Sequence, residues 1–124
     1  VLAMTGQGQE ALNVLQALLS QEPDNADIRY ACAMLAVEIG DFSLAQDYLE
    51  RLLGEKYKES DAVRIALAQI AERTDQYATA ERWLRSVENP QFQRQLALRI
   101  AYAMAKQDRL AEAKEYLAIE LSRL

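Results

Sequence analysis

One pattern recurs along this chain at an almost constant spacing, and it restricts the fold more than any other feature. Alanine is followed by two residues, a large apolar residue and then leucine. The four copies centre on alanines that are 34, 35 and 33 residues apart: Ala11, Ala45, Ala80 and Ala113. In the last three copies a second alanine lies twelve residues earlier, at Ala33, Ala68 and Ala101. A regular period of this length predicts stacked copies of one supersecondary unit.

Each copy has the pattern of two helices joined by a short turn. Apolar residues between 26 and 39 recur at intervals of four, three and four, on one face of a helix: Ile28, Cys32, Leu35 and Ile39. Gly40 can adopt the left-handed conformation that ends this helix, and the Asp41 side chain can cap the next one. In the later copies we expect Asp75 and Asp108 to start the second helices.

The whole chain is therefore predicted to be all-α. We expect helices near residues 9–20, 26–39, 42–53, 60–74, 77–87, 90–106 and 108–124. Asn89 and Pro90 suit the cap and first turn of the sixth helix, whereas Gly6-Gln7-Gly8 suits a turn before the first. These helices are expected to form a single domain of four units, at about 1–25, 26–59, 60–90 and 91–124, of which the first lacks its leading helix.

Small side chains at the helix crossings would let paired helices approach closely. Ala33 with Ala45, and their counterparts in the later copies, meet this need. Bulky residues can then fill the space towards neighbouring pairs, at Tyr48, Trp83 and Tyr116. Trp83 alone could instead be an exposed anchor for a partner, although its two counterparts favour a packing role. A lone pair cannot bury both of its apolar faces, so the pairs must stack.

These residues together resemble the tetratricopeptide-repeat signature, a helix–turn–helix unit of about 34 residues. The matching positions include the alanines of both helices, Pro23, Pro90, the Gly40-Asp41-Phe42 turn, and Leu49, Leu84 and Leu117. The chain departs from the signature early and late in the first helices, at Arg29, Arg64, Ala97, Ala36, Ala71 and Met104. Other repeats built from helical hairpins remain the structural alternative.

The resemblance implies a right-handed superhelix of antiparallel helix pairs, whose concave surface is lined by the first helices. The residues expected to face this groove and bind a partner are Tyr30, Met34, Val37, Ile65, Gln69, Glu72, Leu98, Tyr102 and Lys106. Some family members grip a C-terminal carboxylate with basic and amide side chains at such positions, but several of the residues here are apolar. We therefore expect an extended peptide or an amphipathic helix as ligand. The alternative is that these residues only pack between helices.

Charge and composition argue against several other functions. The net charge of −5 disfavours binding to nucleic acid or anionic lipid. No apolar run approaches the ~20 residues that a membrane-spanning helix needs, so we expect no membrane insertion. The chain has no histidine and one cysteine, Cys32, on the predicted buried stripe. The commonest general base and the usual zinc ligands are thus missing, and we predict neither an enzyme nor a cofactor or metal.

The leading functional prediction is a scaffold or adaptor that binds a protein or peptide. The alternative is a structural spacer or self-association domain. Its motive is the apolar surface at the two ends, which either missing flanking repeats or a second copy should cover: residues 1–4, Leu117, Leu121 and Leu124. The chain opens on Val1, in residues that look like the end of a helix, so we expect it to be a piece of a larger, bacterial member of this family. The compartment stays open between cytoplasm and periplasm for a soluble protein.

Overall fold

A computed structural model describes the backbone of residues 2–123 and the side chains of residues 6–123. The chain divides into two units, Val1–Val63 and Arg64–Leu124. The expected apolar surface at residues 1–4 and at Leu124 lies outside the described side chains.

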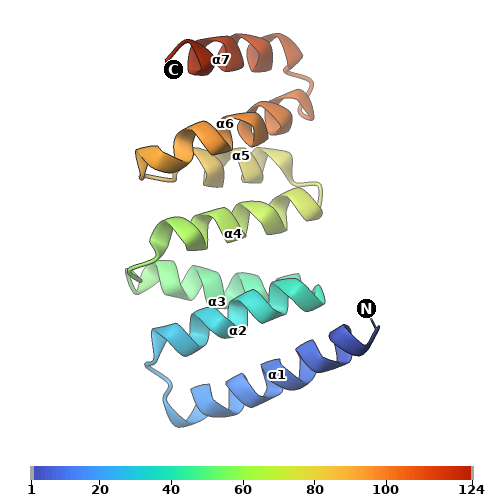
Figure 1. Ribbon diagram of the computed structural model, residues 1–124, viewed down its shortest axis with the longest axis vertical. Helices are drawn as coiled ribbons and strands as arrows, with labels where there is room; N and C mark the ends of the chain where they lie inside the picture. Colours follow the sequence, from blue (N-terminus) through green and yellow to red (C-terminus); the bar gives the residue numbers. More distant parts are fainter. Residues whose placement is uncertain (1, 124) are drawn as a thin grey trace. The chain divides into compact units, whose positions relative to one another are not determined.

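Seven α-helices account for the regular structure of residues 2–123 (Figure 1). Unit 1 contains α1 (Leu2–Gln21), α2 (Ala26–Ile39), α3 (Phe42–Gly54) and the first four residues of α4 (Ser60–Arg73). Unit 2 contains the rest of α4, α5 (Tyr77–Arg85), α6 (Pro90–Ala105) and α7 (Leu110–Ser122). The all-α prediction is therefore confirmed for the described residues, and the bounds of α2 to α7 lie within two residues of those predicted.

One turn geometry recurs between the helices of each pair. A residue with left-handed backbone follows the first helix at Gly40 (φ +86°), Asp75 (φ +60°) and Asp108 (φ +61°). In all three turns the next N–H donates to a carbonyl oxygen five residues back, at 2.8–3.1 Å: Asp41 to Ala36, Gln76 to Ala71 and Arg109 to Met104. This pairing satisfies carbonyl groups at the end of the first helix, and it repeats with the period of the sequence.

The left-handed turns correct two predictions. Asp75 and Asp108 do not cap the second helices; Gln76 and Arg109 occupy the cap positions, without a side-chain hydrogen bond to the backbone. The aspartates instead take the place of Gly40, because a short polar side chain tolerates left-handed backbone better than most residues do. Asp41 does cap α3 as predicted, since its carboxylate accepts from the backbone N–H of Leu44 at 3.3 Å.

Two asparagines cap first helices. The Asn25 side chain accepts from the N–H of Ile28 at 3.1 Å, and the Asn89 side chain accepts from the N–H of Gln91 at 2.9 Å. Pro90 follows Asn89 in the first turn of α6, as predicted. Each cap satisfies a donor that the helix itself leaves unpaired.

The first helix is longer than predicted. Gly6 and Gly8 lie inside α1, so the expected turn at this point is wrong. A Cβ atom on Gly8 would come within 2.8 Å of the Cγ2 atom of Ile39 on α2, whereas a Cβ on Gly6 would meet nothing within 4 Å. Gly8 is therefore a close-contact position between α1 and α2.

The repeat alanines of the three complete pairs are all in the core, whereas Ala11 of α1 is half-buried. Ala33 and Ala45 are fully buried in unit 1, and Ala68 and Ala80 are fully buried in unit 2. The core cluster of unit 2 brings together α4, α5, α6 and α7 through Ala68, Leu84, Val87, Leu96, Ile100, Ala101, Met104 and Ala113. Trp83 and Tyr116 are half-buried against this cluster, which favours the packing role of these bulky residues.

A buried carboxylate joins α5 to the end of α6. Glu81 is 8% exposed and accepts hydrogen bonds from Arg85 at 2.8 Å, from Gln107 at 2.9 Å and from Arg109 at 2.7 Å. Burial acts to raise the pKa of Glu81, but the hydrogen bonds from Gln107, Arg109 and Arg85 outweigh it and hold the pKa below its ordinary value. The charge is thus stabilised within the fold of unit 2.

Candidate functional site

The most exposed apolar residues on a first helix belong to α6. Leu98 is 69% exposed and Tyr102 is 56% exposed, and they lie one turn apart on the helix. The other side of α6 carries Leu96, Ile100 and Met104, which are buried in the core of unit 2. This helix therefore uses one stripe for packing and has a second apolar stripe in solvent.

The Tyr102 ring is held in place by neighbours within unit 2. It meets the Tyr77 ring edge to face, with centroids 6.0 Å apart. The Lys106 ammonium lies 5.5 Å from the centroid of Tyr77 and 5.9 Å from that of Tyr102, within cation–π distance of both. The hydroxyl of Tyr77 donates to Asp75 at 3.2 Å. Desolvation, followed by this bond to Asp75, raises the pKa of Tyr77, so the phenol stays protonated.

Tyr77 is the site residue that the sequence prediction missed. It occupies the aromatic position of the turn, where Phe42 stands one repeat earlier, and no role is predicted for it from the sequence. The available signal was its place as the first residue of a second helix, directly after the turn that follows a first helix. With Tyr102 and Lys106 it forms what we call the Tyr102 cluster: Tyr77, Tyr102 and Lys106.

The other predicted residues of unit 2 differ in how far their side chains are free to contact a partner. Ile65 is half-buried against the core of the unit, and Gln69 is half-buried. Glu72 accepts two hydrogen bonds from the guanidinium of Arg99, at 3.0 and 2.6 Å. This forked ion pair fixes α4 to α6 and compensates the charge of Glu72.

In unit 1 the predicted residues lie on α2. Tyr30 is half-buried, and its ring centroid lies 5.5 Å from that of Tyr57 at an interplanar angle of 33°. Met34 is half-buried as well, whereas Val37 is only 4% exposed and belongs to the core. Tyr30 and Met34 are therefore the residues of this unit that remain available on the first-helix surface.

Tyr57, whose ring lies beside that of Tyr30, is held in place by a hydrogen bond to a carboxylate. The Tyr57 hydroxyl donates to the Asp27 carboxylate at 2.8 Å. Burial, followed by this hydrogen bond, raises the pKa of Tyr57 to about 12. The same bond, together with Lys58 at 3.6 Å, lowers the pKa of Asp27. The ring beside Tyr30 is thus an uncharged, anchored aromatic group.

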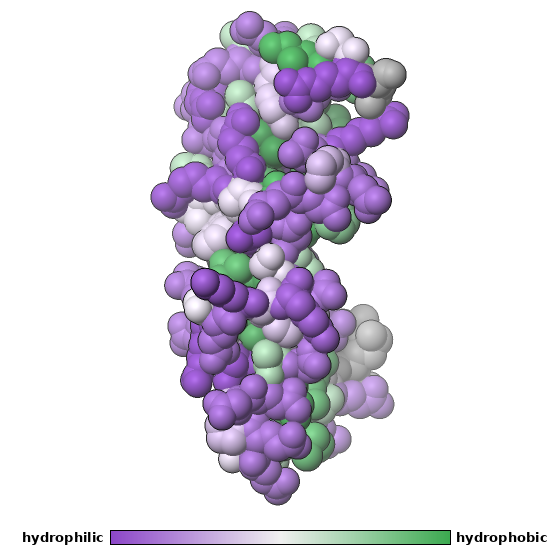
Figure 2. Space-filling view, turned by 90° about the vertical axis from the view of Figure 1, so that its left-hand side faces the viewer, coloured by the Kyte–Doolittle hydropathy of each residue, from purple (hydrophilic) through white to green (hydrophobic). Residues whose placement is uncertain are grey.

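A groove runs between α6 and α7. It consists of two hollows of about 390 and 260 Å³ that share Leu98 and Leu117. We call it the α6–α7 groove, and it shares Leu98 and Tyr102 with the exposed stripe of α6. Its apolar and aromatic lining is Pro90, Ala97, Leu98, Ala101, Tyr102, Ala105, Leu110, Ala113, Leu117 and Leu121. In the space-filling view, hydrophobic side chains gather at the C-terminal end of unit 2 among hydrophilic ones (Figure 2). Leu110 and Leu121 are 56% and 61% exposed, so this lining is accessible.

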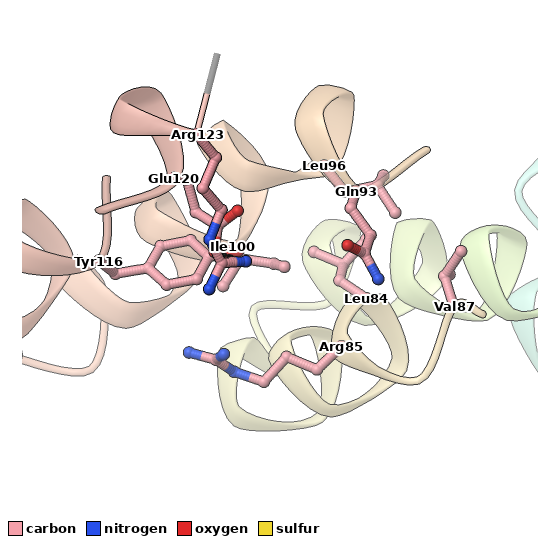
Figure 3. Close-up of a pocket in the computed structure, with 9 residues that line it drawn as sticks. All are labelled: Leu84, Arg85, Val87, Gln93, Leu96, Ile100, Tyr116, Glu120 and Arg123. Carbon is pink, nitrogen blue, oxygen red and sulfur yellow. Dashed lines mark ion pairs between the residues drawn. The ribbon is translucent and has the colours of Figure 1, made fainter. Parts of the chain in front are cut away.

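A smaller pocket of about 210 Å³ lies among α5, α6 and α7 (Figure 3). Each of its two guanidinium groups, those of Arg85 and Arg123, already forms an ion pair with a glutamate. Arg85 pairs with Glu81 at 2.8 Å and lies 5.0 Å from the centroid of the Tyr116 ring, and Arg123 pairs with Glu120 at 3.4 Å. The pocket therefore offers no uncompensated positive charge for an anion.

The single thiol of the chain lies in the core. Cys32 has no exposed surface, and burial raises the pKa of its thiol, which disfavours the nucleophilic thiolate. Within residues 6–123, no three side chains of the metal-binding types gather in a way that could hold an ion. No helix among the described residues combines the length and the apolar character needed to cross a bilayer.

A family model described as tetratricopeptide repeat matches residues 2–70, which is more than half of the chain and extends from α1 into α4. No curated protein matches the chain. The matched segment contains the Gly40 turn and the alanines of the first complete pair, which are the residues that carry the repeat pattern.

Proposed function

This chain belongs to the tetratricopeptide-repeat family, and on that premise we propose that it holds a segment of a partner protein on the surface of its first helices. Repeats of this family generally mediate protein–protein interaction. The segment is an extended peptide or an amphipathic helix. The proposed contact residues are Tyr30, Met34, Ile65, Gln69, Glu72, Leu98, Tyr102 and Lys106, together with Tyr77 at the start of α5, which packs on Tyr102.

The exposure of Leu98 and Tyr102 carries this proposal. Two large apolar side chains one turn apart would each lose contact with water on binding, which is worth roughly 1.5–3 kcal/mol per fully buried side chain. Aromatic residues dominate the energetics of protein interfaces because they bury a large area with little rotamer entropy. The packing of Tyr102 against Tyr77 restricts that rotamer further before any ligand arrives.

The polar groups beside these residues indicate how a ligand would be oriented. Lys106 places a positive charge beside the two rings of the Tyr102 cluster, where a carboxylate of the ligand could pair with it. Met34 on α2 is an adaptable side chain that suits ligands of varied shape. The surface therefore combines an apolar anchor site with one cationic neighbour.

Capture of partners by the full-length protein tests the proposal. Tyr30→Ala and Tyr102→Ala should each reduce the recovery of the same partner protein by at least about fivefold, as expected for interface aromatics. Ile119→Ala on α7 is the matched control, because Ile119 is a large apolar residue that is 48% exposed and outside the proposed surface. Equal recovery with all three variants, at unchanged thermal stability, contradicts the proposal.

A self-association domain is the second candidate function. It is supported by the exposed apolar residues of the outer helices, among them Val14 at 61% on α1 and Leu121 at 61% on α7. Light scattering of the chain separates the candidates. A mass that stays monomeric from micromolar to near-millimolar concentration counts against self-association.

A further inference from the structure

Two tyrosine pairs of this chain have similar surroundings that differ by one charge. In unit 2 the Tyr77 and Tyr102 rings meet edge to face, and the Tyr77 hydroxyl donates to the Asp75 carboxylate at 3.2 Å. The Lys106 ammonium lies 5.5 and 5.9 Å from the two ring centroids. Unit 2 thus contains an aromatic pair that holds a cation beside an acid.

The tyrosine pair of unit 1 has the two rings and the acid without the cation. The centroids of Tyr30 and Tyr57 are 5.5 Å apart, and the Tyr57 hydroxyl donates to the Asp27 carboxylate at 2.8 Å. Among the described side chains, no lysine or arginine lies within cation–π distance of either ring. Both rings are half-buried, so part of each remains open to a ligand.

The repeat does not require an aromatic ring at Tyr30. The counterparts of this residue in the later copies are Ile65 and Leu98, which are aliphatic. An aliphatic side chain therefore serves this position of a first helix elsewhere in the chain. The ring of Tyr30 adds a π face, which attracts cations and which the repeat pattern leaves unexplained.

The exposed charges of α2 are all negative. The helix has three charged residues, of which Asp27 and Glu38 are exposed acids. The third, Arg29, is buried and already forms an ion pair. The surface of α2 around Tyr30 therefore favours a positively charged ligand.

The loop after α3 adds one more acid and one exposed lysine. Burial, followed by the negative charge of Glu59, raises the pKa of Tyr30, so this carboxylate acts on the ring. Lys58 lies 3.6 Å from the Asp27 carboxylate, but the two side chains are 69% and 66% exposed. Because water screens such a pair, a better-placed cation can displace Lys58 from Asp27.

Arginine fits these groups better than lysine does. Its planar guanidinium can stack on a tyrosine ring while two of its N–H groups bind one carboxylate. It is also less strongly hydrated than an ammonium group, so its transfer from water costs less. The bond from the Tyr57 hydroxyl to Asp27 draws electron density into the Tyr57 ring, which strengthens the attraction of that ring for a cation.

We propose that unit 1 binds an arginine side chain of the partner segment at the Tyr30 site, which consists of Asp27, Tyr30 and Tyr57. The guanidinium stacks on the tyrosine rings and pairs with Asp27 in place of Lys58. Met34, one turn after Tyr30 on α2, contacts an apolar neighbour of the arginine.

This inference rests on the proposed function, because Tyr30 and Met34 belong to the first-helix surface. It adds the charge of the segment that meets unit 1. The Tyr102 cluster selects no further cation, because Lys106 already occupies that place.

Three peptides test the preference for arginine with the 124-residue chain. Each consists of alanine and leucine around one central residue, with blocked ends and a neutral dye. The central residue is arginine, lysine or citrulline, which has the shape of arginine without its charge. We expect the arginine peptide to bind at least about fivefold more tightly than the citrulline peptide and about threefold more tightly than the lysine peptide, as measured by fluorescence anisotropy.

Variants of the chain assign this preference to the site. Asp27→Asn should reduce the preference for arginine over citrulline to less than about twofold. Asp47→Asn is the matched control, because it removes the same charge from an exposed residue of α3 outside the site. Lys58→Ala should strengthen binding of the arginine peptide about twofold and leave the citrulline peptide unchanged, because it removes the cation that competes for Asp27.

Nuclear magnetic resonance tests the same site in the natural chain, so the test does not depend on how well a variant folds. The arginine peptide should shift the ring resonances of Tyr30 and Tyr57. The citrulline peptide at equal concentration should shift them much less. Tyr48 on α3 is the control ring and should not respond to either peptide.

Three results would overturn the inference: equal affinity of the arginine and citrulline peptides, a preference that Asp27→Asn leaves unchanged, and Tyr30 and Tyr57 resonances that do not move. Each of them leaves partner capture through Tyr102 as it was. Conversely, partner capture that ignores both Tyr30→Ala and Tyr102→Ala contradicts the proposed function while the arginine preference of the chain persists. The two failures can therefore be told apart.

Discussion

Arg29 of α2 forms an ion pair with Glu55, the residue that follows α3, and also donates to the carbonyl oxygen of Pro23. The Arg29 side chain is 2% exposed, whereas the Glu55 side chain is 41% exposed. One buried guanidinium thus connects the loop before α2, the start of α2 and the end of α3. It occupies the position where the family signature has a bulky residue, and it fills that volume with a side chain that needs hydrogen-bond acceptors.

Replacement of Arg29 should therefore destabilise the fold. We expect Arg29→Ala to lower the free energy of unfolding by about 2–4 kcal/mol, because it removes a buried side chain and leaves the Pro23 carbonyl without its donor. Arg51→Ala is the control: Arg51 pairs with the same Glu55 at 3.7 Å but is 60% exposed, so the loss should stay within about 0.5 kcal/mol. Urea unfolding measures both. Similar losses from the two variants would contradict this role of Arg29.

The two glycines of α1 should respond to alanine in opposite ways. Gly8→Ala places a Cβ against the Ile39 side chain and should lower the free energy of unfolding by about 1–3 kcal/mol. Gly6→Ala meets open space and should raise it by up to about 1 kcal/mol, since alanine favours a helix. Thermal unfolding of both variants, and of Gly8→Ala combined with Ile39→Ala, provides the measurement. If the Ile39→Ala background does not reduce the loss, the close contact between α1 and α2 is not its cause.

Substitutions at the left-handed turns should change the free energy of unfolding in a direction set by the backbone φ angle. Gly40→Ala should lower the free energy of unfolding by about 1–2 kcal/mol, because φ at this position is +86°. Gly54→Ala, at the helical end of α3 with open space around the new Cβ, should be neutral or stabilising by up to about 1 kcal/mol. Asp108→Gly should retain or raise stability, since glycine adopts a φ of +61° without strain. Chemical denaturation of the three variants checks the signs, and a stabilising Gly40→Ala would refute the turn assignment.

The buried carboxylate of Glu81 should make the stability of the fold depend on pH. Its pKa in the folded state lies below the ordinary value of 4.5, so the folded chain releases this proton more readily than the unfolded chain. The stabilisation is complete above about pH 4.5 and is lost as the pH falls through the folded pKa. Glu81→Gln should cost about 2–4 kcal/mol at pH 7. The difference from the natural chain should shrink at pH 3 in urea unfolding, and a difference independent of pH would contradict the account.

Much of the fold was predictable from the sequence because the repeat is a short-range pattern. The spacing of small and large apolar residues directly reflects helix crossings, so α2 to α7 were located within two residues. The errors occurred where one residue type suits two structures. Gly6 and Gly8 resemble a turn until the contact with Ile39 is known, and aspartate suits both a helix cap and a left-handed turn.

The candidate site was less predictable, because its contacts join residues that are distant in sequence. Val37 has the spacing of a surface residue on α2 but is 4% exposed. The edge-to-face contact joins Tyr77 and Tyr102, which are 25 positions apart in the sequence, and no local sequence pattern predicts it.

Site-specific photocrosslinking tests the central claim, partner binding on the first-helix surface, most directly. A photoreactive phenylalanine analogue is placed at Tyr30, at Tyr102 or at the control position Ile119 in the full-length protein, in its native cells. The account predicts that position 102 crosslinks to a distinct partner protein, that position 30 crosslinks to the same partner or another segment of it, and that position 119 does not. Crosslinks of equal yield at all three positions, or at position 119 alone, would contradict it.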